Sequence, residues 1–115
     1  MSIQRFETGP RMSHAVVHAG TVYLAGVVAR DLTPSVASQT RQILAEIDRL
    51  LALAGSDKTK LLAANIWLAD IRGYDEMNTV WDAWVAPGNP PARATVEARL
   101  AKPEYLVEIM VRAAV

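Results

Sequence analysis

The sequence predicts an α+β fold in which a mixed β-sheet carries two helices on one of its faces. Segments that are rich in β-branched residues or alternate in polarity occur near both ends of the chain and in its middle. Two stretches between them repeat apolar residues every three or four positions, as amphipathic helices do. No repeat, linker or low-complexity tract interrupts the 115 residues. We therefore expect a single domain over residues 1–115.

The N-terminal part predicts three strands. Residues 3–7 could form a short edge strand, and residues 15–18 and 22–28 are rich in β-branched side chains. Ala19 and Gly20 separate the last two segments, which is typical of a hairpin.

The first helix is expected to begin at Thr33 and Pro34. Threonine caps helices well, and proline fits the first helical position because its missing N–H would be unbonded there. Gly55 is expected to end the helix in the left-handed conformation. The apolar stripe comprises Val36, Thr40, Ile43, Ile47, Leu50, Leu51 and Ala54.

A strand over residues 61–68 and a second helix follow. Leu62, Ala64, Ile66 and Leu68 are expected to share one face of the strand, with Asn65 and Trp67 on the other. The helix should begin near Asp70 or Tyr74 and end at the proline-rich residues 87–91. Its apolar face comprises Met77, Val80, Trp81, Trp84 and Val85.

Residues 94–100 and 105–115 alternate in polarity, and we expect them to pair as a hairpin across a turn at residues 101–104. The last strand is apolar on both faces. One face carries Val107, Ile109, Val111 and Ala113, and the other carries Leu106, Met110 and Ala114 with Glu108 among them. Helices on one side would leave the second face exposed, and an apolar area of that size usually marks an interface. Oligomerisation is therefore expected from the residues alone.

Composition narrows the class of protein. Hydrophobic residues make up 51% and charged residues 21%, which is typical of a globular chain. Twelve basic residues balance twelve acidic ones without a basic run, which disfavours a nucleic-acid partner. The N-terminus has no apolar stretch resembling a signal peptide, and no aliphatic run could span a membrane. The absence of cysteine fits a reducing compartment, so a cytoplasmic location is expected.

Two charges stand out near the C-terminus. Arg93 follows a proline pair at the start of a strand, and Glu108 lies fifteen residues later inside an apolar strand. A carboxylate in such a strand is costly unless it is paired or exposed. An arginine fork can grip a carboxylate through two parallel hydrogen bonds. From the residues alone, the interpretation of both as ordinary charges, paired with each other or solvated, is favoured over a role in the site. In the expected hairpin they would lie roughly 13 Å apart, so a ligand, a long side chain or a neighbouring subunit would have to bridge them.

Several short segments resemble the RidA (YjgF) family in their order and spacing. They are Gly20-Thr-Val-Tyr-Leu-Ala-Gly26, Gln39-Thr40, Ala54-Gly55, Met77-Asn78, Pro91-Ala-Arg-Ala94 and Val107-Glu-Ile109. The Pro-Ala-Arg segment, with a glutamate fifteen residues after its arginine, is the most specific of them. The helix end Trp81-Asp-Ala-Trp-Val85 resembles a subgroup distinct from the best-known imine deaminases.

The resemblance implies a chorismate-mutase-like fold and a homotrimer whose sheets form a central barrel, with ligand clefts between subunits. It implies that Arg93 binds the carboxylate of a 2-imino or 2-oxo acid and that Glu108 holds the hydrolytic water. The backbone at Gly26 would line the cleft, and Asn78 falls where the family places a supporting residue. No cofactor is implied.

The cleft wall departs from the family pattern at three positions. Met12 stands where the family commonly has a tyrosine, Val27 where glutamine is frequent, and Thr95 where cysteine is usual. These changes bear on the identity of the substrate and on turnover more than on binding of a carboxylate.

Two functions are weighed. The first is cofactor-free hydrolysis of reactive 2-imino or enamine acids to 2-oxo acids and ammonia. The alternative is a non-catalytic module that binds small 2-oxo or related carboxylates. Ribonuclease activity, which is attached to some relatives, is disfavoured by the balanced charge. No metal site is expected, because His14 and His18 would lie roughly 13 Å apart along one strand.

Overall fold

The computed structural model describes residues 2–115, so Met1, the first residue of the expected domain, lies outside the described part. The strands are β1 (Gln4–Thr8), β2 (Ser13–His18), β3 (Thr21–Leu24), β4 (Leu61–Leu68), β5 (Ala92–Glu97) and β6 (Val107–Ala114). The α-helices are α1 (Val36–Leu53) and α2 (Tyr74–Trp84), and the short 3-10 helices are η1 (Lys58–Lys60) and η2 (Ile71–Gly73).

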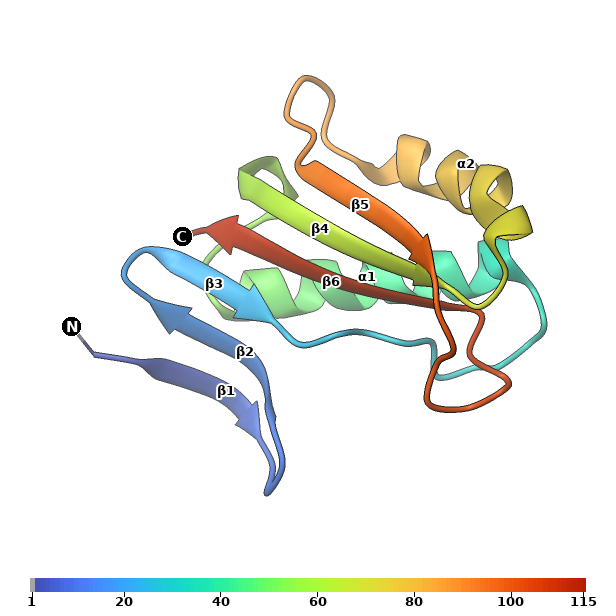
Figure 1. Ribbon diagram of the computed structural model, residues 1–115. Helices are drawn as coiled ribbons and strands as arrows, with labels where there is room; N and C mark the ends of the chain where they lie inside the picture. The colour runs from blue at the N-terminus through green and yellow to red at the C-terminus, as the bar shows by residue number, and fades with distance from the viewer. Residues whose placement is uncertain (1) are drawn as a thin grey trace.

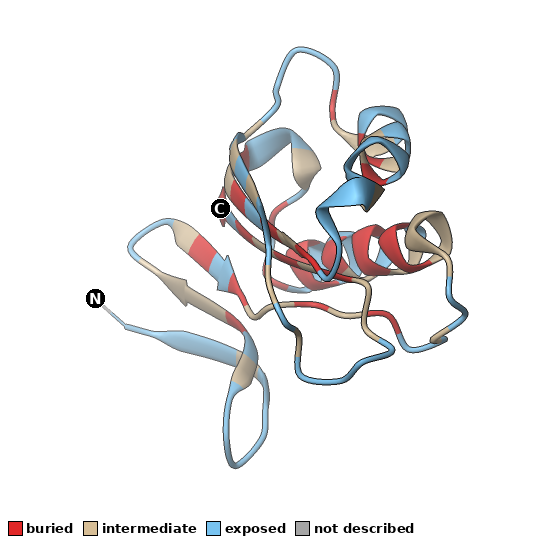
Figure 2. Cartoon of the chain, turned by 45° about the vertical axis from the view of Figure 1, so that its right-hand side comes forward, coloured by how far each residue is buried: buried red, intermediate tan, exposed pale blue. Residues whose placement is uncertain are grey.

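The strands form one six-stranded mixed sheet in the order β1-β2-β3-β6-β4-β5. Only β4 and β5 run parallel, and the other neighbours are antiparallel. Both helices cover the same face of the sheet, so the expected α+β arrangement is confirmed (Figure 1). Between this face and α1 lies the buried core (Figure 2).

The hairpin between β2 and β3 forms as predicted. Ala19 and Gly20 occupy its turn with φ angles of 51° and 80°. Positive φ at both central residues matches the twist of the flanking strands. The second strand of this hairpin was expected over residues 22–28. It is shorter in the structure, where β3 ends at Leu24. Beyond it the chain keeps only one bridge to β6, in which Val27 and Ile109 exchange backbone hydrogen bonds of 2.8 and 3.1 Å.

Helix α1 begins two residues later than predicted. Its N-cap is Ser35, whose hydroxyl accepts a hydrogen bond from the N–H of Ser38 at 3.1 Å, whereas the backbone and hydroxyl of Thr33 bond to Asp31. The predicted stop is confirmed, since Gly55 has a φ of 83°. The last carbonyls of the helix accept from the N–H groups after it, a Schellman arrangement.

Strand β4 contains a β-bulge between Leu61 and Ala63 that the pattern did not reveal. The extra residue changes the face of its neighbours, so Leu61 is buried while Leu62 is 50% exposed. The placement of Leu62 with the buried residues was therefore wrong. After the bulge, Ala64, Ile66 and Leu68 face the helices as predicted.

The expected C-terminal hairpin is also wrong. Strand β5 pairs in parallel with β4, and β6 pairs with the other side of β4, so β5 and β6 are not neighbours. The chain from β4 through α2 to β5 forms a β-α-β crossover, which places β5 beside β4 (Figure 1). Residues 98–106 then pass across the end of β4 to reach β6, so the connection is longer than the tight turn expected at residues 101–104.

The sheet face away from the helices carries apolar side chains, as the alternation of β6 predicted. Val107, Ile109 and Val111 are buried toward the helices, while Glu108 and Met110 are half-buried on the open face. Tyr23 and Val96, on other strands of the open face, are 40% and 51% exposed.

Candidate functional site

Arg93 lies on β5 and faces helix α2. It pairs with Ala64 of β4, whose side chain points into the core beneath the helices. The guanidinium carbon lies 5.2 Å from the ring centre of Trp81 and 5.8 Å from that of Tyr74. Its Nη2 donates a hydrogen bond of 3.2 Å to the Tyr74 hydroxyl. Among residues 2–115 Arg93 forms no ion pair, so two aromatic rings hold the charge and no acidic side chain occupies its fork.

Asn78 and Thr95 belong to the same layer between α2 and β5. Thr95 lies two residues after Arg93 on the same side of β5, and Asn78 lies between Tyr74 and Trp81 on the helix. The Asn78 Oδ1 and Thr95 Oγ1 atoms are buried and have no hydrogen-bond partner within residues 2–115. A buried unpaired polar atom costs about 1–3 kcal/mol. Such atoms in a native fold call for an explanation, and here they coincide with two predicted site positions.

Glu108 lies on β6 and points to the open face, beside Trp67 of β4. Burial raises the pKa of its carboxyl above the usual 4.5, because the charged form loses water. The carboxylate lies over the backbone of Gly26. A methyl group at Gly26 would overlap Oε2 of Glu108 and would lie 3.1 Å from its Cδ. Glycine at position 26 therefore makes room for the carboxylate.

The sequence-predicted residues thus form two groups within one subunit. Arg93, Asn78 and Thr95 lie on the helix side of the sheet, while Glu108 and Gly26 lie on the open side. Met12 joins neither group. It is 49% exposed in the β1–β2 connection, and β1 and β2 lie at the edge of the sheet opposite to β5 (Figure 1).

Tyr74 and Trp81 are contacts of Arg93 that the sequence reading missed. Trp81 was assigned to the apolar face of the second helix, and Tyr74 only to its start. A detectable signal was present, because positions 74, 78 and 81 are spaced by four and three residues and share one helix face. Two aromatic residues flanking Asn78 on one helix face, opposite the strand that carries Arg93, would have indicated that they contact Arg93.

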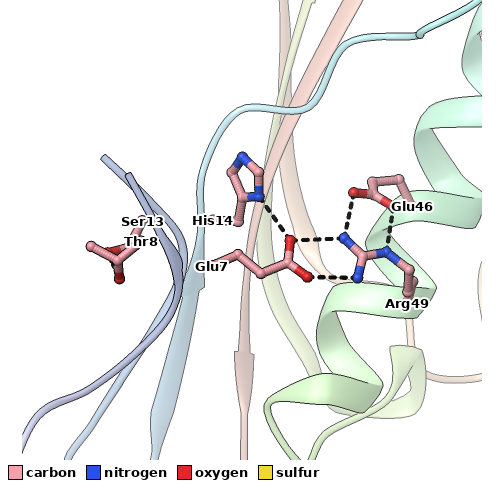
Figure 3. A network of polar contacts seen from close by, with 6 residues as sticks. All are labelled: Glu7, Thr8, Ser13, His14, Glu46 and Arg49. Atoms are coloured by element: carbon pink, nitrogen blue, oxygen red, sulfur yellow. Dashed lines mark hydrogen bonds and ion pairs between the residues drawn. The ribbon is translucent and has the colours of Figure 1, made fainter. Parts of the chain in front are cut away.

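A second polar cluster ties the first strand to α1. His14 Nδ1 lies 2.9 Å from Glu7 Oε1, and Arg49 donates to both oxygens of Glu7 at 2.7 and 2.9 Å (Figure 3). Arg49 also donates to Glu46. Hydrogen bonds from Arg49 and then His14 lower the pKa of Glu7 to about 2. The cluster fastens the β1–β2 hairpin to the helix.

A groove of about 760 Å³ opens between α1 and the segment after β3. Gly26, Arg30 and Tyr105 line it, and neither Arg93 nor Glu108 does. The predicted catalytic pair is thus not assembled in this groove. Within residues 2–115 no cluster of three or more His, Asp or Glu side chains could hold a metal ion. The same residues contain no helix long and apolar enough to cross a membrane.

Comparison with known proteins decides the family. The family described as Endoribonuclease L-PSP matches residues 2–115. The chain belongs to this family. It is 44% identical to the RutC family protein YoaB of Escherichia coli K12, and the match covers all of both chains. It is also 44% identical to a RutC family protein of Haemophilus ducreyi, over 98% of this chain and 97% of the relative.

Solved structures of the YjgF and Rid proteins share the fold. A YjgF family member from Neisseria meningitidis is 53% identical and superposes with a TM-score of 0.97, covering 99% of this chain and 95% of that one. A Rid family protein from Yersinia pestis is 28% identical with a TM-score of 0.93, covering 99% and 100%. The resemblance inferred from the Pro-Ala-Arg segment is therefore confirmed, as is the α+β fold with a six-stranded mixed sheet and two helices.

Proposed function

We propose that this YjgF/Rid protein hydrolyses reactive 2-imino and enamine acids to 2-oxo acids and ammonia in clefts between the subunits of a homotrimer. The observation that carries the proposal is the division of the site. Arg93 and Glu108 point to opposite faces of one sheet, so a single subunit cannot place both against one small ligand. A neighbouring copy packed on the open apolar face supplies the missing half and forms a barrel of sheets at the centre.

In this proposal Arg93 binds the carboxylate of the ligand. Its guanidinium is free of acidic partners among residues 2–115 and offers the planar fork that suits a carboxylate. Asn78 and Thr95 carry the unpaired oxygen atoms beside it and complete the polar wall of the cleft. Met12, in the exposed β1–β2 connection, reaches the cleft from a different copy.

Glu108 is proposed as the base. It takes a proton from water as the water oxygen bonds to the iminium carbon and the C=N π-electrons move to nitrogen. It then returns that proton to nitrogen. The C–N bond breaks as the new hydroxyl group forms the oxo group and gives up its own proton through Glu108 to the departing ammonia. A raised pKa makes the carboxylate a stronger base, and the backbone at Gly26 confines it. Binding of the carboxylate by Arg93 fixes the imine carbon relative to this water. The steps need neither a metal nor an organic cofactor.

The alternative is a binding module for small 2-oxo acids that performs no chemistry. Met12, which replaces the usual tyrosine, favours it, because it removes a polar group from the cleft wall. Val27, which replaces the usual glutamine, does not bear on the choice, since its side chain is buried in the core at the bridge to Ile109. RNA cleavage, which the family description names, is less well supported. The chain carries twelve basic and twelve acidic residues, whereas a surface that binds phosphates is usually basic.

The deciding experiment supplies freshly generated 2-aminoacrylate and follows the release of pyruvate and ammonia. The rates are compared without protein, with wild type and with the Arg93→Ala variant. Acceleration by the wild type and its loss in the variant are expected. Tight pyruvate binding without any acceleration would leave the binding module as the function.

A further inference from the structure

Within residues 2–115, the hydrogen bond and the cation–π contacts of the Arg93 guanidinium come from one helix. Trp81 and Tyr74 present their rings to it at 5.2 and 5.8 Å, and the Tyr74 hydroxyl accepts a hydrogen bond from Nη2. The two residues are seven positions apart on α2 and therefore lie on one face of the helix. Arg93 crosses from the edge strand to meet both.

We infer that Tyr74 and Trp81 are positioning residues that hold the Arg93 guanidinium in a fixed orientation, with its fork open to an incoming carboxylate. The inference rests on the proposed function, in which Arg93 binds the carboxylate of a 2-imino or 2-oxo acid. We call the pair the aromatic clamp.

The chemistry of the clamp distinguishes it from a structural ion pair. A carboxylate partner would take two donors of the guanidinium and neutralise its charge. Aromatic rings attract the cation through their π-electrons and leave its hydrogen-bond donors free. The Tyr74 hydroxyl accepts from one of the five donors, so four remain and a two-point grip stays possible. The Arg93 guanidinium is thus held in place and can still bind a carboxylate.

The clamp is itself anchored. Trp81 is only 5% exposed, and its ring packs against Trp84 at 5.3 Å between ring centres. The indole of Trp84 donates a hydrogen bond of 3.0 Å to Asp48 on α1. Tyr74, at 40% exposed, forms the outer wall. Trp81 therefore contacts the guanidinium from the buried side, and Tyr74 contacts it from the exposed side through its ring and its hydroxyl.

A fixed arginine binds better because its side chain is already ordered before the ligand arrives. Loss of the clamp should therefore weaken carboxylate binding even though Arg93 keeps its charge. For turnover, the same loss should raise KM with little change in kcat, since the carboxylate contact is made in both the ground state and the transition state.

The test is calorimetric titration of pyruvate into wild type, Tyr74→Phe, Trp81→Phe and Trp81→Leu. Tyr74→Phe removes one hydrogen bond and should weaken binding about two- to tenfold. Trp81→Leu removes an aromatic face and should weaken it by about tenfold, while Trp81→Phe keeps a weaker face and should recover part of the loss. Tyr105→Phe, in the segment between β5 and β6 and away from the clamp, is the matched control and should bind as wild type.

A direct readout without ligand separates positioning from general stability. In wild-type protein the Arg93 side-chain protons should be shifted in the NMR spectrum by the currents of the two rings, and Trp81→Leu should lose most of that shift. If the Tyr74 and Trp81 variants melt at lower temperature but bind pyruvate like wild type, the inference is overturned while the proposed function stands. If wild type and Arg93→Ala bind pyruvate equally weakly, the proposed function fails. A ring-current shift of Arg93 that is still present in the wild type would then show that the clamp serves the fold alone.

Discussion

Arg93 and Glu108 lie on opposite faces of the sheet, with β4 running between their strands. Arg93 pairs with Ala64 and Glu108 with Trp67, three residues further along β4. Two strand spacings and this offset place their Cα atoms roughly 14 Å apart. The carboxylate-binding half and the water-binding half of the proposed site are therefore separate in one subunit, and they can be perturbed independently.

Arg93→Ala should weaken pyruvate binding by about 1.5–3 kcal/mol, or one to two decades in affinity, because a charge-assisted contact is lost. Arg93→Lys keeps the charge but loses the fork, so its loss should be smaller. Calorimetry on proteins of verified assembly mass measures both. An Arg93→Ala protein that retains its assembly and binds pyruvate as wild type does would exclude Arg93 from the site.

Gly26→Ala should damage turnover through Glu108. The added methyl group would overlap Oε2 of Glu108, which is the far end of a flexible side chain. The carboxylate can therefore move aside, and we expect a folded protein whose base is displaced. Imine hydrolysis should fall at least tenfold, about 1.4 kcal/mol in barrier height, with pyruvate affinity changed much less.

Gly9→Ala is the matched control, since a methyl group there meets only the Met12 carbonyl at 3.8 Å. Equal rates for Gly26→Ala and wild type would mean that Glu108 does not need its observed position.

The periodic parts of the fold could be predicted from sequence because side-chain spacing follows the geometry of each element. The buried stripe of α1, the Ala19-Gly20 turn and the two faces of β6 all follow this rule. The pairing of β5 could not be predicted in this way. Alternation shows which face a strand buries but not which strand lies beside it, so β5 and β6 were placed together although β4 separates them.

The site shows the same limit. The types and spacing of Arg93 and Glu108 indicated their roles, and the family resemblance selected among the alternatives. The surroundings of Arg93 depend on how α2 lies across β5, which no local pattern encodes. Tyr74 therefore went unrecognised as a contact, and Trp81 was assigned to the helix core alone.

The proposed assembly predicts a particle of three chain masses by light scattering. Val96 is 51% exposed on the open face, so Val96→Glu should place a charge in the subunit interface and lower the particle mass. Leu53→Glu changes a similarly exposed residue, at 44%, on α1 and should leave the mass unchanged. A monomeric wild-type protein at micromolar concentration would contradict the assembly and the shared cleft together.

The cluster around Glu7 predicts an acid-dependent loss of stability. The folded-state pKa of Glu7 is about 2, below the ordinary 4.5, so its contribution is present above about pH 4.5 and is lost as the pH falls toward 2. Glu7→Gln should therefore melt below wild type at pH 7 and converge with it near pH 2. Thermal melts across this range measure the effect, with Glu104→Gln, outside the cluster, as the control. A constant difference at all pH values would contradict the ionic origin.

Glu108→Gln should separate chemistry from binding and from stability. Glutamine nearly preserves the shape of the side chain but cannot accept the proton from water, so imine hydrolysis should be lost while pyruvate affinity stays within a few-fold of wild type. In the wild type, the rate should fall as the pH drops through the raised pKa of Glu108, because only the carboxylate is a base.

The Glu108→Gln variant, which loses activity, should gain stability relative to wild type at neutral pH. A folded-state pKa above 4.5 means that the fold favours the protonated form, so the contribution of Glu108 to stability is present at low pH and lost as the pH rises through that pKa. The melting temperature of Glu108→Gln relative to wild type should therefore be higher at pH 7 than at pH 4. Retained hydrolysis in Glu108→Gln would remove Glu108 as the base, whatever the melts show.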